Sequence, residues 1–302
     1  MNVFEPFLDA EDLSTCVSAG ETPAGLNARA EALGCFWPLW LDPGQNFGDL
    51  YLKVRATSRS FRYGWIGDNV LGLLWRLPSG RELRLGGRTV KNVTGFDLVR
   101  FFSASQERFG RPSALILRLR PRAEARLNLR LSGSWSGLRN LARSVRGSSW
   151  AHALESCDLR AEAKSAAIVL GFEAKASLLP LFRAQAETWS REHALVLAES
   201  PADALVQAEP WARMQAPLDD CVGLAEEWLV RYGGTIHGFL GQGLLQLEAP
   251  GSIQGAEQGL HELHRRLSES GGHCEHPSLT ADPDAPQARW ERELSDRLDV
   301  PT

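Results

Sequence analysis

The chain has 302 residues, of which 43% are hydrophobic and 23% charged, and its formal net charge is -4. This composition predicts a globular protein with a buried core and excludes a disordered chain. No apolar run is long enough to span a membrane, and four acidic residues among the first thirteen argue against a signal or transit peptide. We therefore expect a cytoplasmic protein. The cysteines agree with this, because they are far apart and form no CxxC pair: Cys16, Cys35, Cys157, Cys221 and Cys274.

Charge is distributed unevenly along the sequence. Residues 51–150 contain 20 Lys and Arg against 5 Asp and Glu, whereas residues 1–50 contain 1 against 8. A basic segment of this kind indicates an anionic ligand or an acidic partner surface, or equally an arginine-rich sheet face in solvent. Aromatic residues are not interleaved with the arginines of the predicted strands, so nucleic acid is not an expected partner.

The first half of the chain is expected to contain helices, a β-hairpin and further strands. Residues 1–40 have the pattern of helix and turn, with one amphipathic helix over Pro23–Gly34. A hydrophobic strand over Val70–Leu77 precedes a Pro-Ser-Gly turn and an alternating strand, which predicts a hairpin. Asp97 lies where the N-cap of a short helix would be, and the alternation over Ala114–Arg120 predicts another strand.

The second half alternates helices and strands, which indicates an α+β packing. No internal repeat is convincing in the sequence, and a domain boundary is expected near residue 124. The predicted helices cover Gly137–Val145, Leu178–Ala194, Leu218–Arg231, Gln254–Ser268 and Gln287–Leu298, and the predicted strands cover Leu127–Leu131, Ala166–Phe172, Ile236–Leu240 and Gly243–Leu247.

The segment Gly86–Leu98 has the composition of a loop that binds an anionic cofactor. Its two leading glycines lack Cβ atoms, so the backbone can approach a bulky ligand. Arg88 and Lys91 offer cationic donors, and Asn92 can both donate and accept hydrogen bonds. Gly95, just before a capped helix, leaves backbone N–H groups available to an anion. From the residues alone, a β-bulge followed by a helix start with surface cations is an equally good interpretation.

This segment and its surroundings resemble the FAD-binding domain of the vanillyl-alcohol-oxidase (PCMH-type) flavoproteins, most closely the FAD-binding subunit of bacterial glycolate oxidase. The segment is similar to the family signature GGxxxKNVxGYDLxxLxxGSxGTLGxI, and Asp42–Gly48 resembles the Pro-containing turn and TxGG loop. Arg62–Gly72 resembles the RxGyGxxRDxVLG stretch, and Leu115–Pro121 resembles the closing vtLrLrP strand. The resemblance covers residues 38–122 well, and beyond them only the outline of an α+β cap domain is similar.

The resemblance implies that the chain binds FAD, which would carry out the redox chemistry while the protein orients it. No residue is expected to act as a catalytic acid, base or nucleophile. The implied partners are a larger flavoprotein subunit and an iron–sulfur subunit. The residues implied to contact or line the cofactor site are Gln45, Asn46, Gly48, Arg62, Gly87, Lys91, Asn92, Gly95 and Asp97.

Several positions depart from the family pattern. The residues before the match contain no Gly-rich pyrophosphate loop, so the first FAD subdomain is expected to be incomplete. Asp49 and Glu107 stand where the family has glycines, and carboxylates there would repel cofactor phosphates. The family's C-terminal NPG motif is also absent. These departures support an alternative hypothesis, a degenerate scaffold subunit that no longer binds FAD.

Other catalytic motifs are absent from the sequence. There is no G-x-S-x-G elbow, no Walker A loop and no GxGxxG fingerprint after a strand. His261, His264, His273 and His276 lie close together around Cys274, but their spacing matches no common zinc pattern. We therefore expect no metal site.

Together these features predict an α+β protein in two domains. A PCMH-type FAD-binding domain, truncated at its N-terminus, is expected over residues 1–123. A cap-like α+β domain with a C-terminal helix is expected over residues 124–302. The expected function is that of the FAD-binding subunit of a flavin-linked oxidoreductase that acts on a 2-hydroxy acid such as glycolate and is inactive alone. The alternative is the non-catalytic scaffold subunit.

Overall fold

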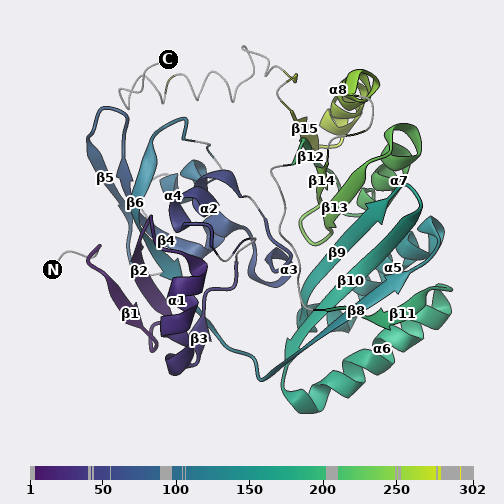
Figure 1. Ribbon diagram of the computed structural model, residues 1–302, viewed down its shortest axis with the longest axis horizontal. Helices are drawn as coiled ribbons and strands as arrows, with labels where there is room; N and C mark the ends of the chain where they lie inside the picture. Colours follow the sequence, from purple (N-terminus) through teal and green to yellow (C-terminus); the bar gives the residue numbers. More distant parts are fainter. Residues whose placement is uncertain are drawn as a thin grey trace. The chain divides into compact units, whose positions relative to one another are not determined.

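The computed structural model of the chain divides into two compact units, each with its own sheet (Figure 1). The first unit contains the described residues of Met1–Thr57 and Tyr63–Arg122, and the second contains Ser58–Arg62 and Ala123–Thr280. The chain therefore enters the second unit for five residues and then returns to the first. The structure describes residues 4–39, 42, 44–54, 56–88, 97–103, 105, 107–201, 210–248, 250, 253–276, 278–279 and 293.

The framework of the first unit is a five-stranded antiparallel sheet with the order β1-β2-β6-β4-β5. β4 and β5 form the hairpin expected around the Pro-Ser-Gly turn, with Trp75 opposite Leu83. β3 and β7 form a separate two-stranded sheet. The strands are β1 (Phe7–Asp9), β2 (Ser14–Ser18), β3 (Cys35–Phe36), β4 (Val70–Arg76), β5 (Glu82–Gly86), β6 (Arg111–Arg118) and β7 (Arg120–Pro121).

Short helices pack on this sheet and enclose a core rich in aromatic residues. Trp75 of β4 stacks on Phe102 of α4 with ring centroids 4.2 Å apart. The buried Tyr51 hydroxyl of α2 donates a hydrogen bond to the Val99 carbonyl of α4, which ties these two helices together. The helices of this unit are α1 (Pro23–Ala30), α2 (Phe47–Lys53) and α4 (Leu98–Phe102), whereas α3 (Ser60–Tyr63) belongs to the second unit except for Tyr63.

The second unit contains an eight-stranded antiparallel sheet with the order β11-β8-β10-β9-β13-β14-β12-β15 (Figure 1). Alternate strand residues, such as Leu159, Ile168 and Leu245, share one core with the inner sides of four helices. The helices are α5 (Trp135–Gly147), α6 (Leu179–Glu192), α7 (Cys221–Tyr232) and α8 (Ile253–Glu269). The strands are β8 (Ala125–Ser132), β9 (Leu154–Glu162), β10 (Ser165–Ala174), β11 (Val196–Glu199), β12 (Ala212–Gln215), β13 (Thr235–Phe239), β14 (Leu244–Leu247) and β15 (His273–Glu275).

This unit is built from two β-α-β-β-α-β halves, although no repeat is convincing in the sequence. The first half runs β8-α5-β9-β10-α6-β11, and the second runs β12-α7-β13-β14-α8-β15. In each half the strands, numbered in chain order, lie in the order 4-1-3-2, as in the ferredoxin-like motif. The halves join where β9 pairs with β13, and the first helix of each half, α5 or α7, packs against the other.

The short segment Ser58–Arg62 docks on the second unit through buried contacts. The Arg59 guanidinium pairs with the Glu155 carboxylate of β9, and both side chains are buried. A Cβ atom on Gly241 would lie 2.4 Å from the nearest ring carbon of Phe61, so glycine is needed for this close approach. The segment is therefore an integral part of the second unit.

Most predicted elements are confirmed, but the prediction for residues 1–40 is wrong in part. β1 and β2 occur where helix and turn were expected. Four of the five residues of β2 are buried, so the strand lacks the polar alternation that marks a half-exposed strand. Its partner β6 is also far away in sequence. The helix predicted over Gln287–Leu298 lies outside the described residues, except for Glu293.

Candidate cofactor site

Asn46 and Gln45, which were predicted to contact a flavin, lie at the start of α2. The Asn46 Oδ1 atom accepts a hydrogen bond from the Asp49 backbone N–H at 2.8 Å, so Asn46 is the N-cap of this helix. Its Nδ2 atom donates to the Asp49 carboxylate at 2.9 Å. The Gln45 backbone N–H donates to the Asp42 carbonyl at 3.1 Å. Asn46 therefore already has a role in the fold, because it starts α2.

Gly48 allows α2 to approach the end of β2 closely. The Gly48 backbone N–H donates to the Ala19 carbonyl at 2.8 Å, and the residue is buried. A Cβ atom here would lie 3.2 Å from the Ala19 Cβ and 3.3 Å from its carbonyl oxygen. The glycine is explained by this helix–strand contact, whatever else it contacts.

Asp49 and Glu107, which stand where the resembling family has glycines, both pair with the guanidinium of Arg111. An Arg111 Nη atom lies 3.2 Å from Asp49 and 3.5 Å from Glu107. Lys53 adds a second cation 3.5 Å from Asp49. The structure thus pairs each carboxylate with a basic side chain of the same unit, and all four side chains keep some exposure to solvent.

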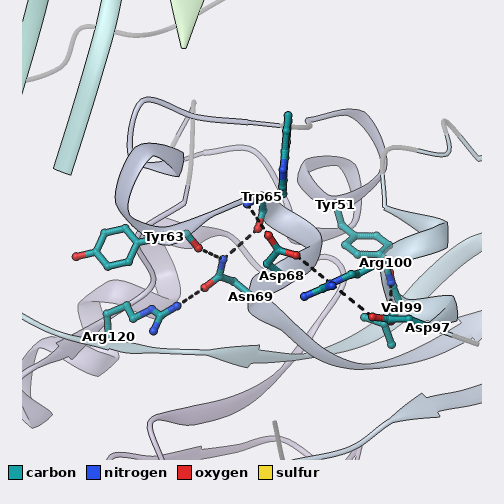
Figure 2. A network of polar contacts seen from close by, with 9 residues as sticks. All are labelled: Tyr51, Tyr63, Trp65, Asp68, Asn69, Asp97, Val99, Arg100 and Arg120. Carbon is teal, nitrogen blue, oxygen red and sulfur yellow. Dashed lines mark hydrogen bonds and ion pairs between the residues drawn. The ribbon is translucent and has the colours of Figure 1, made fainter. Parts of the chain in front are cut away.

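Asp97 is the N-cap of α4, as the sequence predicted (Figure 2). Its carboxylate accepts a hydrogen bond from the Arg100 backbone N–H at 3.1 Å. The Arg100 guanidinium lies 3.4 Å from Asp97 and 2.9 Å from Asp68. This arginine links the start of α4 to the short 3₁₀ turn over Ile66–Asn69.

Asn69, which sequence reasoning did not single out, is the centre of the neighbouring polar network (Figure 2). It is fully buried, and its Nδ2 donates to the Tyr63 carbonyl at 2.7 Å and the Trp65 carbonyl at 3.0 Å. Its Oδ1 accepts from the Arg120 guanidinium at 2.7 Å, and that guanidinium also lies over the Tyr63 ring. A buried amide with its partners satisfied fixes the chain path between α3 and β4.

The glycine pair after the hairpin divides into one constrained and one unconstrained position. Gly86 has a φ of +67°, and a Cβ atom there would lie 2.1 Å from the Leu71 carbonyl oxygen, so only glycine fits. At Gly87 a Cβ atom would meet no described atom within 4 Å, although its N–H donates to Leu71 at 3.1 Å. The remaining loop residues of the predicted site, Lys91, Asn92 and Gly95, lie outside the described residues.

Arg62 is the one described residue of the predicted site that belongs to the second unit. Its Nη1 atom donates to the Glu173 backbone carbonyl of β10 at 3.2 Å. The other five described residues of the set, Gln45, Asn46, Gly48, Gly87 and Asp97, belong to the first unit.

Most polar groups of the described residues of the set have hydrogen-bond partners within their own unit. Asn46, Arg62 and Asp97 use side-chain polar groups to hold helices or strands in place, and the glycines use backbone N–H groups. Two clefts in the second unit, of about 120 Å³ and about 380 Å³, are lined by none of the predicted residues. We therefore assign no redox step to these side chains.

The second unit presents a row of polar side chains that the sequence did not reveal. Across five adjacent strands, Arg160 lies opposite His237, His237 opposite Gln246, Gln246 opposite Arg213, and Arg213 opposite Glu275. Most of the residues on either side of them belong to the core under the helices, so the row occupies the other face of the sheet. These residues are far apart in sequence, so only strand pairing brings them together.

Asp158 lies two residues before Arg160 on the same face of β9. Its side chain is fully buried, one carboxylate oxygen lies 3.9 Å from His237 Nε2, and the other has no hydrogen-bond partner in the described structure. A buried carboxylate with an unsatisfied oxygen lowers the stability of the folded protein, so Asp158 is an unusual residue at this part of the sheet face.

The cysteines and the C-terminal histidines offer no reactive centre among the described residues. All five cysteines are free and buried. Burial raises the pKa of Cys16 to about 11 and those of Cys221 and Cys274 to about 12, so these thiols are protonated at neutral pH. Within the described part of the chain, no three His, Cys, Asp or Glu side chains are grouped as metal ligands. His264 Nδ1 instead accepts from the Cys274 backbone N–H at 3.0 Å.

The fold is α+β, in two successive α+β units, and resembles that of the PCMH-type FAD-binding proteins. A solved structure of alkyldihydroxyacetonephosphate synthase superposes with a TM-score of 0.68 at 10% sequence identity. The match covers 98% of this chain and 65% of that one. Similarity at this low identity supports the fold alone.

The curated relatives include a D-lactate dehydrogenase, glycolate oxidase subunits and FAD-linked oxidoreductases. The chain is 33% identical over 112 residues to the mitochondrial D-lactate dehydrogenase [cytochrome] of Arabidopsis thaliana. It is 30% identical over 126 residues to glycolate oxidase subunit GlcD of Bacillus subtilis, and 37% identical over 107 residues to subunit GlcE of Escherichia coli.

These matches are partial. They cover 37%, 40% and 35% of this chain, and they span only 20%, 26% and 30% of the three relatives' own lengths. No protein-family model matches the sequence. Among the described helices, none combines the length and the apolar character needed to cross a membrane.

Proposed function

We propose that this chain is a subunit of a flavin-linked oxidoreductase that acts on a 2-hydroxy acid such as glycolate, and that its first unit binds FAD. The observation that carries the proposal is the similarity to GlcD and GlcE, combined with the PCMH-type fold. The second unit would act as the cap, and the partners would be a larger flavoprotein subunit and an iron–sulfur subunit. Five free thiols support a reducing compartment such as the cytoplasm.

The polar row of the second unit supports a substrate of this class. Arg160 and Arg213 place two guanidinium groups on one sheet face, with His237 and Gln246 between them. Arginine is well suited to bind a carboxylate, because its planar guanidinium can donate two parallel hydrogen bonds.

A second candidate function is the scaffold subunit that no longer binds FAD. It is favoured by the ion pairs of Arg111 with Asp49 and Glu107. Because two carboxylates already pair with this guanidinium, it is less available to pair with a phosphate. Under this alternative, the chain would hold partner subunits together without a cofactor of its own.

The test is to record the absorption spectrum of the purified full-length chain and to identify any flavin released by acid. Release of FAD, or saturable uptake of added FAD, supports the first proposal. A colourless protein that takes up no FAD contradicts it for the isolated chain. In that case the double variant Asp49→Gly/Glu107→Gly provides a further comparison. FAD uptake by the variant alone would support the scaffold hypothesis, because it would show that these carboxylates block the site.

A further inference from the structure

A cleft of about 120 Å³ lies between α5 and α7, where the two halves of the second unit meet. Its floor is largely apolar and includes Cys157 of β9, Leu240 and Phe61. Its rim carries three arginines of α5 at helical spacing, so they lie on one side of the helix, and one carboxylate, that of Asp219. The arginines are Arg139, Arg143 and Arg146.

The three arginines differ in their partners. Arg139 pairs with Glu226 of α7 at 3.1 Å, and Arg146 pairs with Asp219 at 2.6 Å. Arg143 lies between them in sequence, is exposed, and has no ion-pair partner within the described part of the chain. Arg143 is therefore the rim arginine that remains available to pair with a bound anion.

The volume limits what can enter the cleft. At about 120 Å³ it is smaller than the roughly 300–1,000 Å³ of sites for drug-sized ligands, so a flavin or a nucleotide does not fit. A short hydrocarbon chain fits this volume. Burial and the neighbouring Asp158 raise the pKa of the Cys157 thiol, so this part of the floor is a neutral, weakly polar surface and no nucleophile.

We propose that this cleft binds a short apolar monocarboxylate of about the size of butyrate. The carboxylate pairs with Arg143, and the hydrocarbon chain covers the floor between α5 and α7. The apolar floor accounts for a preference for longer chains over acetate, and the cationic rim accounts for a preference for the acid over a neutral amide. The site contains none of the predicted cofactor residues, so the proposal stands apart from FAD binding.

The experiment is titration of the full-length protein with acetate, butyrate and butyramide, followed by calorimetry and saturation-transfer difference NMR. We expect butyrate to bind more tightly than acetate and butyramide to bind at least about tenfold more weakly than butyrate. Arg143→Gln should weaken butyrate binding about tenfold and abolish the preference over butyramide. Arg265→Gln is the matched control, because it removes an exposed arginine of α8 that does not line the cleft.

A second variant tests the floor independently of charge. Ala142 lines the cleft, so Ala142→Leu should fill part of it and reduce butyrate binding more than acetate binding. Circular dichroism should confirm that each variant is folded. The proposal is overturned if butyrate does not bind, if butyramide binds equally well, or if Arg143→Gln and Arg265→Gln have the same effect.

Discussion

Replacing Glu155 with glutamine would remove one charge from a buried ion cluster in the second unit. Glu155 pairs with Arg59, and only 5% and 9% of the two side chains are exposed. Arg126 pairs with Glu173 and lies 4.0 Å from Glu155. Two guanidinium groups and two carboxylates therefore balance each other where water has little access, and Glu155→Gln leaves one guanidinium without compensation.

The burial of this ion pair sets the expected loss in the free energy of unfolding for Glu155→Gln. Removing one partner of a buried ion pair typically costs about 3–5 kcal/mol, whereas replacing both partners with apolar residues is often neutral. We expect Glu155→Gln to fall near the lower end, because Arg126 is 38% exposed and can adjust toward solvent. A loss of about 3 kcal/mol corresponds to a fall in Tm of roughly 6–12 °C for a domain of 150–250 residues. Arg59→Met/Glu155→Met should cost much less than Glu155→Gln alone.

The assay is urea unfolding followed by tryptophan fluorescence, with calorimetry to separate the transition of the second unit. Asp219→Asn is the control, since it makes the same change in an ion pair whose side chains are both 49% exposed, and exposed pairs contribute at most about 1 kcal/mol. The reasoning is refuted if Glu155→Gln costs no more than Asp219→Asn. It is also refuted if the double methionine variant is less stable than Glu155→Gln.

Two further predictions concern a backbone position and an ion pair between helices. Gly86→Ala should destabilise the first unit by at least about 1–3 kcal/mol, because it adds positive-φ strain and a steric clash with the Leu71 carbonyl oxygen. Gly87→Ala should leave the free energy of unfolding nearly unchanged, and urea unfolding of both variants measures the difference. Hydrogen bonds from Arg266 at 2.8 and 3.3 Å hold the pKa of Glu227 below its usual range. The stability from this pair is therefore complete above the usual Glu pKa of about 4.3 and is lost as pH falls through the lowered pKa. The stability gap between wild type and Glu227→Gln should narrow in acid, and a gap that widens below pH 4 would contradict this assignment.

Local patterns in the sequence were sufficient for elements whose stabilising contacts are local. Asp97 was predicted as an N-cap from its place before Leu98–Phe102, and the structure confirms it, because capping depends on residues three positions apart. The β4–β5 hairpin was predicted for the same reason, since its register is set by a short turn. In both cases the partner atoms lie within a few residues of the signal.

Elements and residues defined by distant pairing were not predictable in the same way. β9 was not expected, since eight of its nine residues are buried or half-buried and acidic residues interrupt the apolar pattern. The polar row and the joining of the two ferredoxin-like halves depend on the pairing of β9 with β13, which lie more than seventy residues apart. Arg62 and Glu173 meet across 111 residues, so nothing local in the sequence could indicate their hydrogen bond.

Asp49 and Glu107 show how a substitution can be noticed in a sequence while its physical effect depends on the fold. The sequence indicated two carboxylates that would repel phosphates, but Arg111 and Lys53 pair with them, so the local charge is largely balanced. Glu107 nevertheless has a φ of +66°, a conformation that typically costs a residue with a Cβ atom about 1–2 kcal/mol. The backbone at this position thus adopts a conformation that favours glycine. The ion pair of Glu107 with Arg111 is exposed to solvent, so it offsets only a small part of that strain.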